Sequence, residues 1–75
     1  MAYYINRNGN SGVRAYEIGD NFIIVHFSNL AVYEYNYQVT GIENVEQMKQ
    51  LAINGEGLNS FINRNVKFKY SRKLR

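Results

Sequence analysis

Three short runs of β-branched and aromatic residues, separated by gaps of hairpin length, limit the possible folds more than any other feature. The runs are Val13–Ile18, Phe22–Phe27 and 31–37, and the gaps between them are rich in Gly, Asp, Asn and Ser. Such runs are typical of strands, and the gap residues are typical of tight turns. The sequence therefore predicts a three-stranded antiparallel β-meander.

The apolar pattern changes from a strand period to a helical period after the third run. Thr40 and Glu43 have the spacing of a capping box, which predicts a helix start at this point. Gly55 and Gly57 supply left-handed residues that can end the helix. We therefore expect one main helix near residues 42–54. Its apolar stripe consists of Val45, Met48, Leu51 and Ala52.

A second, shorter helix is expected near residues 58–64, because apolar residues recur at helical spacing from Leu58 to Ile62. Beyond it, residues 66–70 alternate between apolar and polar side chains, which is typical of a strand. The expected fold class is therefore α+β. It consists of a three-stranded antiparallel β-meander followed by one main helix and a second short helix, with a basic C-terminal strand or tail.

The chain of 75 residues is long enough for one domain and too short for two. Residues 1–12 are rich in Asn and Gly, so we expect a flexible lead-in outside the core. The folded domain is expected over residues 13–70, and residues 71–75 form a basic tail. The predicted core consists of Ile23, Val25, Phe27, Leu51, Phe61 and Ile62.

Charge is segregated along the chain. The formal net charge is +3, but residues 1–63 carry six acidic and three basic side chains, whereas residues 64–75 carry six basic and no acidic ones. A basic block of this kind can bind polyphosphate by releasing condensed counterions, contact an anionic membrane surface, or keep a small protein soluble. Charge alone leaves these three roles open.

The third run places Tyr33, Tyr35 and Tyr37 on one face of a strand. Exposed aromatic rings beside Lys and Arg can stack on nucleic-acid bases, whereas half-buried Tyr rings pack at the edge of a core. The two interpretations differ in which face of the sheet the helices cover. The sequence leaves both of them open.

Residue types that carry catalysis or bind metals are scarce. The chain has no cysteine and a single histidine, His26, whose position within a strand favours a structural role. Glu17 and Glu34 can face each other across strands, but a mechanism that pairs carboxylates also needs a deep cleft. No glycine-rich phosphate loop follows a strand. We therefore expect no enzymatic activity, no cofactor and no metal site.

No apolar run is longer than five residues, which argues against a membrane-spanning segment. The absence of cysteine fits a reducing compartment. We therefore expect a cytoplasmic protein that has no membrane partner.

Several pieces of the chain, taken in order, resemble one known family. The triplet Tyr33-Glu34-Tyr35 follows a hydrophobic strand and precedes a helix, and the stretch Phe61-Ile62-Asn63-Arg64-Asn65-Val66-Lys67 leads on to Tyr70. This order is similar to that of the KTSC domain, a module named for the C-terminus of some lysyl-tRNA synthetases, and the resemblance spans residues 12–70. It implies a small α+β module of bacterial or phage proteins, with RNA as the expected ligand. The matched positions are Tyr33, Tyr35, Asn63, Arg64, Val66, Lys67 and Tyr70.

Charge and resemblance together favour a small non-catalytic module that binds nucleic acid, with RNA as the first choice. The expected contacts to phosphate are Arg64, Lys67, Lys69, Arg72, Lys73 and Arg75, and the expected stacking residues are Tyr33 and Tyr35. The alternative is a protein-interaction or homodimerisation module of a bacterial or phage accessory protein. In that case the strand that begins at Val13, or the one that ends at Tyr37, is an open edge that pairs with a partner strand.

Overall fold

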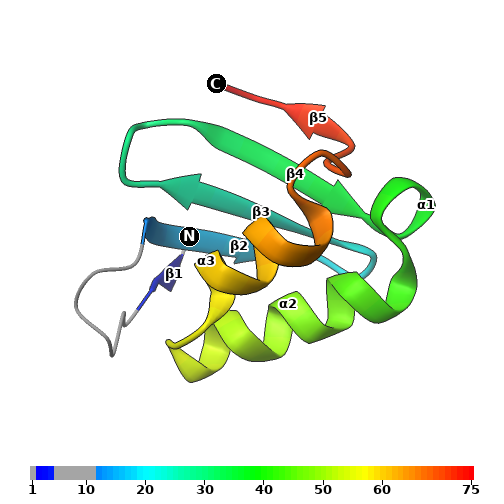
Figure 1. The fold of residues 1–75 in the computed structure, drawn as a ribbon, viewed down its shortest axis with the longest axis horizontal. Coiled ribbons are helices and arrows are strands. Elements are labelled where there is room, and N and C mark those ends of the chain that lie inside the picture. Colours follow the sequence, from blue (N-terminus) through cyan, green and yellow to red (C-terminus); the bar gives the residue numbers. More distant parts are fainter. Residues whose placement is uncertain (1, 5–11) are drawn as a thin grey trace.

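A five-stranded antiparallel sheet carries a layer of helices on one face (Figure 1). The computed structural model describes residues 2–4 and 12–75, and the strand order in the sheet is β1-β2-β3-β4-β5. In chain order the elements are β1 (Ala2–Tyr3), β2 (Val13–Ile18), β3 (Phe22–Phe27), β4 (Val32–Asn36), α1 (Tyr37–Thr40), α2 (Ile42–Asn54), α3 (Leu58–Phe61), the π-helical turn η1 (Ile62–Val66) and β5 (Arg72–Lys73). The predicted α+β class is confirmed.

The predicted meander forms the centre of this sheet. Strands β2 and β3 have the predicted bounds, and β4 is one residue shorter at each end than the run from which it was predicted. The reason at its C-terminal end is local, because the Asn36 side chain accepts a hydrogen bond of 2.9 Å from the Val39 amide. This contact caps α1, so Tyr37 begins a helix where a strand residue was predicted.

The main helix α2 spans residues 42–54, as predicted, but the predicted capping box does not form. The Thr40 hydroxyl donates to the Lys69 carbonyl at 2.6 Å, and the N-cap of α2 is Gly41, which offers no side chain. Thr40 therefore connects the start of α2 to the C-terminal segment. The other end of α2 is as predicted, since Gly55 is left-handed and its amide donates to the Leu51 carbonyl.

The second helical segment, α3 followed by η1, covers residues 58–66, close to the predicted 58–64. The widened turn of η1 buries both Ile62 and Val66. This packing overrides the apolar alternation of residues 66–70, and the strand predicted there is absent. A strand forms a few residues later instead, where Arg72 pairs with Glu34 of β4.

The core lies between the sheet and the helical layer. Of the six predicted core residues, Ile23, Val25 and Ile62 are buried, whereas Phe27, Leu51 and Phe61 are only partly buried and pack against its edge. The core cluster also contains residues that were not in the predicted set, namely Tyr4, Val13, Tyr35, Val45, Met48, Ala52, Leu58 and Val66. Two tyrosines are thus structural residues of this core.

The N-terminal residues correct the expectation that 1–12 lie outside the core. Strand β1 pairs with β2, and Tyr4 is 6% exposed, with its hydroxyl accepting a hydrogen bond of 3.2 Å from the Leu58 amide. The rest of the predicted lead-in, residues 1 and 5–11, lies outside the described residues. The sheet therefore extends beyond the predicted 13–70 boundaries at both ends, through β1 and β5.

The helices of the described ranges 2–4 and 12–75 are too short or too polar to cross a bilayer.

The contact between Tyr4 and Leu58 predicts the effect of a single-atom change. Removing the hydroxyl in Tyr4→Phe leaves the first amide of α3 buried without a partner, which should lower the free energy of unfolding by about 1–3 kcal/mol. Tyr3→Phe is the matched control, because Tyr3 is 75% exposed. Urea denaturation of both variants measures the effect. Equal stability of the two would show that this hydrogen bond contributes nothing.

Candidate functional site

A pocket of about 310 Å³ lies between the β3–β4 hairpin and the segment that includes α3, η1 and the turn after it. Its walls combine aromatic rings with side-chain amides and a single charged group, and no carboxylate belongs to the lining that the described residues provide. The lining residues are Phe27, Asn29, Ala31, Tyr33, Tyr35, Asn59, Ile62, Asn63, Lys67, Phe68 and Tyr70.

The aromatic wall follows from the strand register. Val25 pairs with Tyr33, so Tyr33 lies on the sheet face that the helices cover. The Tyr33 ring packs edge-on against Phe27, with ring centroids 5.7 Å apart, and it lies tilted against Tyr70, with ring centroids 4.7 Å apart. Three rings from β3, β4 and the C-terminal segment therefore meet at one corner of the pocket.

Tyr35 belongs to the same lining and is fully buried. Its hydroxyl oxygen has no hydrogen-bond partner among the residues that are described. Burial, and to a smaller degree the neighbouring Tyr33 and Tyr70, raises the pKa of the Tyr35 hydroxyl far above its ordinary value. The group therefore stays protonated and remains able to donate a hydrogen bond.

This burial corrects the prediction that Tyr35 stacks on bases, because a ring inside the core offers no free face. Tyr33 is half-buried and lines the pocket, so a ligand can reach it there. Tyr37 lies outside the pocket in α1, where its hydroxyl donates to Glu46 at 2.5 Å. The three tyrosines do not form the continuous exposed surface that a stacking platform requires.

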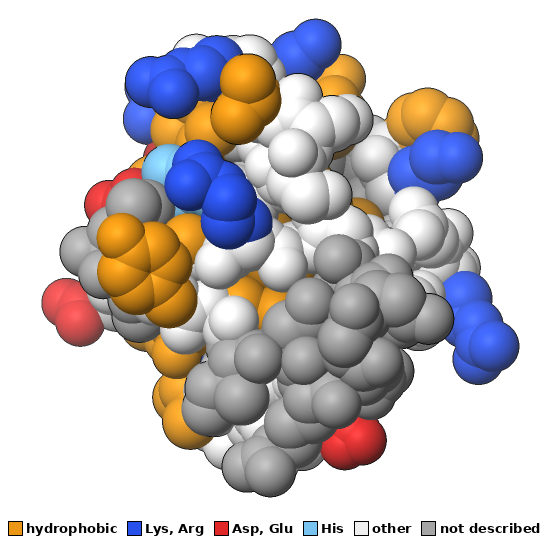
Figure 2. All heavy atoms as spheres, turned by 90° about the vertical axis from the view of Figure 1, so that its left-hand side faces the viewer, with side chains coloured by type: hydrophobic (Ala, Val, Ile, Leu, Met, Phe, Trp, Pro, Cys, Tyr) orange, Lys and Arg blue, Asp and Glu red, His pale blue; other side chains and the backbone are white. Residues whose placement is uncertain are grey.

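The predicted basic residues are all exposed, and they fall into two groups. One follows α3 (Arg64, Lys67 and Lys69), and the other lies on and after β5 (Arg72, Lys73 and Arg75). Figure 2 shows Lys and Arg side chains gathered along the top of the molecule, where β5 lies in Figure 1, and further ones on the side of the helices.

Two of these cations flank the pocket from opposite groups. Lys67 is part of the lining, and its Nζ lies 5.6 Å from the centre of the Phe68 ring. The Nζ of Lys73 lies 5.8 Å from the centre of the Tyr33 ring. Positive charge therefore borders the aromatic wall on the side of η1 and on the side of β5.

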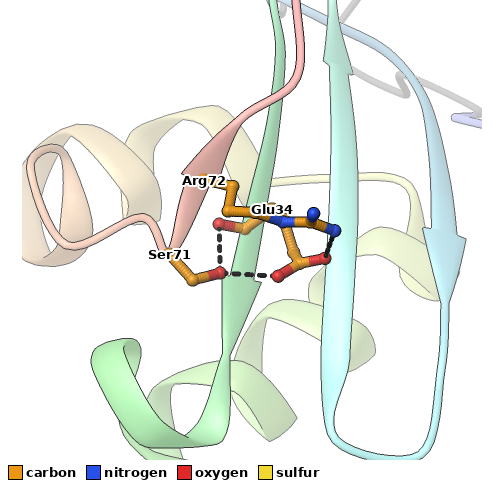
Figure 3. Close-up of polar contacts among 3 residues, drawn as sticks. All are labelled: Glu34, Ser71 and Arg72. Atoms are coloured by element: carbon orange, nitrogen blue, oxygen red, sulfur yellow. Dashed lines mark hydrogen bonds and ion pairs between the residues drawn. The ribbon is translucent and has the colours of Figure 1, made fainter.

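Arg72 differs from the other predicted basic residues because it has an anionic partner (Figure 3). Its guanidinium donates to one carboxylate oxygen of Glu34 at 3.0 Å, and the Ser71 hydroxyl donates to the other at 2.9 Å. The hydrogen bond from Arg72 is the main cause that lowers the pKa of the Glu34 carboxyl, with Ser71 acting in the same direction. Arg72 thus attaches β5 to β4 as well as adding positive charge.

The opposite face of the sheet carries a further group of titratable side chains. His26 Nε2 lies 2.9 Å from a carboxylate oxygen of Glu17. Glu17 and Glu34 share this face, as the sequence allowed, but Ile24 of β3 lies between them in the register. Within residues 2–4 and 12–75, no cluster of three His, Cys, Asp or Glu side chains could hold a metal ion.

The sequence reasoning missed the asparagines of the pocket. Asn29, Asn59 and Asn63 all contribute to the lining, although they come from the β3–β4 turn and from two different helical segments. The only signal was composition, since 11 of the 75 residues are Asn. Phe68 was also missed as a pocket residue, because the alternation of residues 66–70 was interpreted as a strand.

The unpartnered hydroxyl predicts that Tyr35→Phe does not destabilise the protein. Removing a buried polar group that has no partner should leave the free energy of unfolding unchanged or raise it by about 1–3 kcal/mol, the cost of an unsatisfied group. Urea denaturation next to Tyr4→Phe, which loses a formed hydrogen bond, provides the comparison. A marked loss of stability in Tyr35→Phe would show that its hydroxyl is satisfied in solution.

The contact between Arg72 and Glu34 predicts a pH dependence of stability. The pKa of Glu34 is lower in the folded chain than its ordinary 4.5, so its ionised form stabilises the fold above about that pH. This contribution is lost as the pH falls through the lowered folded pKa. In Arg72→Gln the stability should therefore fall less between neutral pH and about pH 3. Unfolding free energies across this range measure the difference, and parallel curves would contradict the role of Arg72.

Comparison with family models, with curated proteins and with solved structures finds no match for this chain. The resemblance to the KTSC domain therefore remains a prediction from the residues.

Proposed function

We propose that this chain is a non-catalytic module that binds single-stranded RNA through the basic residues of its segment 64–75. The observation that carries the proposal is that all six Lys and Arg side chains of this segment are exposed. Arg72 is paired with Glu34, and no ion pair is formed by the other five in the part of the chain that the structure describes. Five cations are thus available to phosphate.

The arrangement of these charges favours a single strand over a duplex. The two basic groups border a pocket with aromatic walls, and aromatic rings beside cations are the usual means by which proteins hold unpaired bases and their phosphates. The resemblance to the KTSC domain supports the same ligand class. The proposal includes a cytoplasmic setting, which the absence of cysteine fits.

The alternative function, a protein-interaction module, was based on an open sheet edge at one of two strands. Strand β2, which begins at Val13, is paired on both sides, by β1 and β3. Strand β4 is likewise paired on both sides, by β3 and β5. The outer strands β1 and β5 each cover two residues of their neighbour, so neither β2 nor β4 is an edge that is open along its whole length, as strand addition would favour. We therefore keep protein binding as the alternative, which a failure to bind RNA would favour.

Salt dependence tests the contribution of charge. If about four of the cations contact phosphate, the logarithm of the association constant should fall with the logarithm of salt concentration at a slope of about −3. Replacing Lys67 and Lys69 together by Gln should reduce the magnitude of that slope by about one to two, because each phosphate contact contributes about 0.7. Fluorescence anisotropy of a short labelled RNA at several salt concentrations measures the slope.

The matched control is Arg14→Gln. Arg14 is an exposed cation on β2, separated from β5 by β3 and β4, so its removal changes the net charge without touching segment 64–75. The control should bind RNA with an unchanged slope. The absence of any binding at low salt would reject the proposal and favour a protein partner instead.

A further inference from the structure

Phe68 is the most exposed aromatic side chain among the residues that the structure describes. It is 83% exposed, although phenylalanine has no polar group that favours contact with water. The other rings of the pocket lining are covered, since Phe27, Tyr33 and Tyr70 are half-buried and Tyr35 is buried. A flat partner can therefore reach the Phe68 ring without any rearrangement of the fold.

The backbone that carries this ring is fixed on both sides. Before the ring, Val66 is fully buried, and its carbonyl accepts a hydrogen bond of 2.9 Å from the Lys69 amide. After the ring, the Lys69 carbonyl accepts a hydrogen bond of 2.6 Å from the Thr40 hydroxyl. Phe68 is thus presented by a fixed turn, so a ligand that binds to it does not have to order the backbone.

Two cations flank the ring in the chain. The Nζ of Lys67 lies 5.6 Å from the centre of the Phe68 ring, and the exposed Lys69 follows the ring directly. Neither lysine forms an ion pair within the described ranges 2–4 and 12–75. An apolar partner would have to cover these charges together with the ring, and burying an unpaired charge is costly. A partner that is both flat and anionic matches the ring and its neighbours.

We propose that Phe68 is a stacking residue, on which one base of a single-stranded RNA lies while Lys67 and Lys69 contact the phosphates beside that base. An aromatic ring next to cations is the means by which many proteins hold unpaired bases without reading their sequence. The base lies on the exposed ring, outside the pocket, and accepts no hydrogen bond from the core. This inference rests on the proposed RNA binding and adds to it a contact that does not depend on charge.

Phe68→Leu tests the ring, because it keeps an apolar side chain and removes the flat aromatic face. It should weaken the binding of a short oligoadenylate RNA about tenfold, which corresponds to about 1.4 kcal/mol, and leave the salt slope unchanged. A strand of equal length with the same ribose-phosphate backbone but no bases should bind the wild type and the variant equally. Fluorescence anisotropy with both labelled strands measures these affinities. Equal RNA affinity of wild type and variant, or an equal loss with the strand that lacks bases, would overturn the inference.

Tyr3→Leu is the matched control for the loss of an exposed ring. Tyr3 is 75% exposed and lies on β1, at the opposite edge of the sheet from β5. Because both side chains are exposed, both variants are expected to keep the fold. Tyr3→Leu should bind RNA as the wild type does, and a tenfold loss there as well would overturn the assignment to Phe68.

Tryptophan fluorescence reports the contact directly, since the chain contains no tryptophan. Phe68→Trp keeps a large aromatic ring at this position, and its fluorescence should fall when the oligoadenylate binds and stay constant with the strand that lacks bases. The fluorescence of Tyr3→Trp should respond to neither strand. Unchanged fluorescence of Phe68→Trp in the RNA complex would overturn the stacking contact.

These measurements distinguish failure of this inference from failure of the proposed function. If RNA binds with the predicted salt slope while Phe68→Leu changes nothing, the role of charge stands and stacking is rejected. If Phe68→Leu weakens RNA binding while the Lys67 and Lys69 substitutions leave the salt slope unchanged, stacking stands and only the phosphate contacts of these lysines are rejected. Absence of binding by either strand at low salt rejects both.

Discussion

The register between β3 and β4 is the constraint on which the rest of the structure depends. It sets Ile23 opposite Tyr35 and Val25 opposite Tyr33, so all four side chains lie on the face that the helices cover. A shift of one residue would turn the tyrosines to the other face and leave α2 without its apolar partners. The hydrophobic core and the aromatic wall of the pocket are consequently two ends of the same side-chain layer.

The order and type of the central elements could be predicted because local patterns and tertiary packing agree there. In the alternating run Phe22–Phe27, the buried side chains are Ile23 and Val25. The apolar stripe from Val45 to Ala52 faces the same core. Prediction failed where two local signals competed for one segment. Asn36 caps α1 ahead of Thr40, and the Thr40 hydroxyl binds a distant carbonyl instead of the start of α2.

The candidate site could be predicted only in part, because charge is visible in a sequence and concavity is not. The exposed cations of segment 64–75 follow from composition. The burial of Tyr35 does not, since a tyrosine on a strand fits either face until the position of the helices is known. Asn29, Asn59 and Asn63 belong to separate elements, and no spacing in the sequence connects them. Only the fold brings these amides together.

Because η1 is a widened turn, the number of residues in it helps to determine the site. A π-helical turn holds one residue more than the α-helical turn it replaces, so the basic segment after η1 is rotated relative to the position that a continuous α-helix from α3 would give it. Deleting a single residue between Ile62 and Val66 would restore the ordinary pitch and rotate everything beyond it by about 100°. Lys67 would then leave the pocket without any change in the chemistry of its side chain. Homologous chains that share this site should therefore tolerate many substitutions in this turn but few changes in its length.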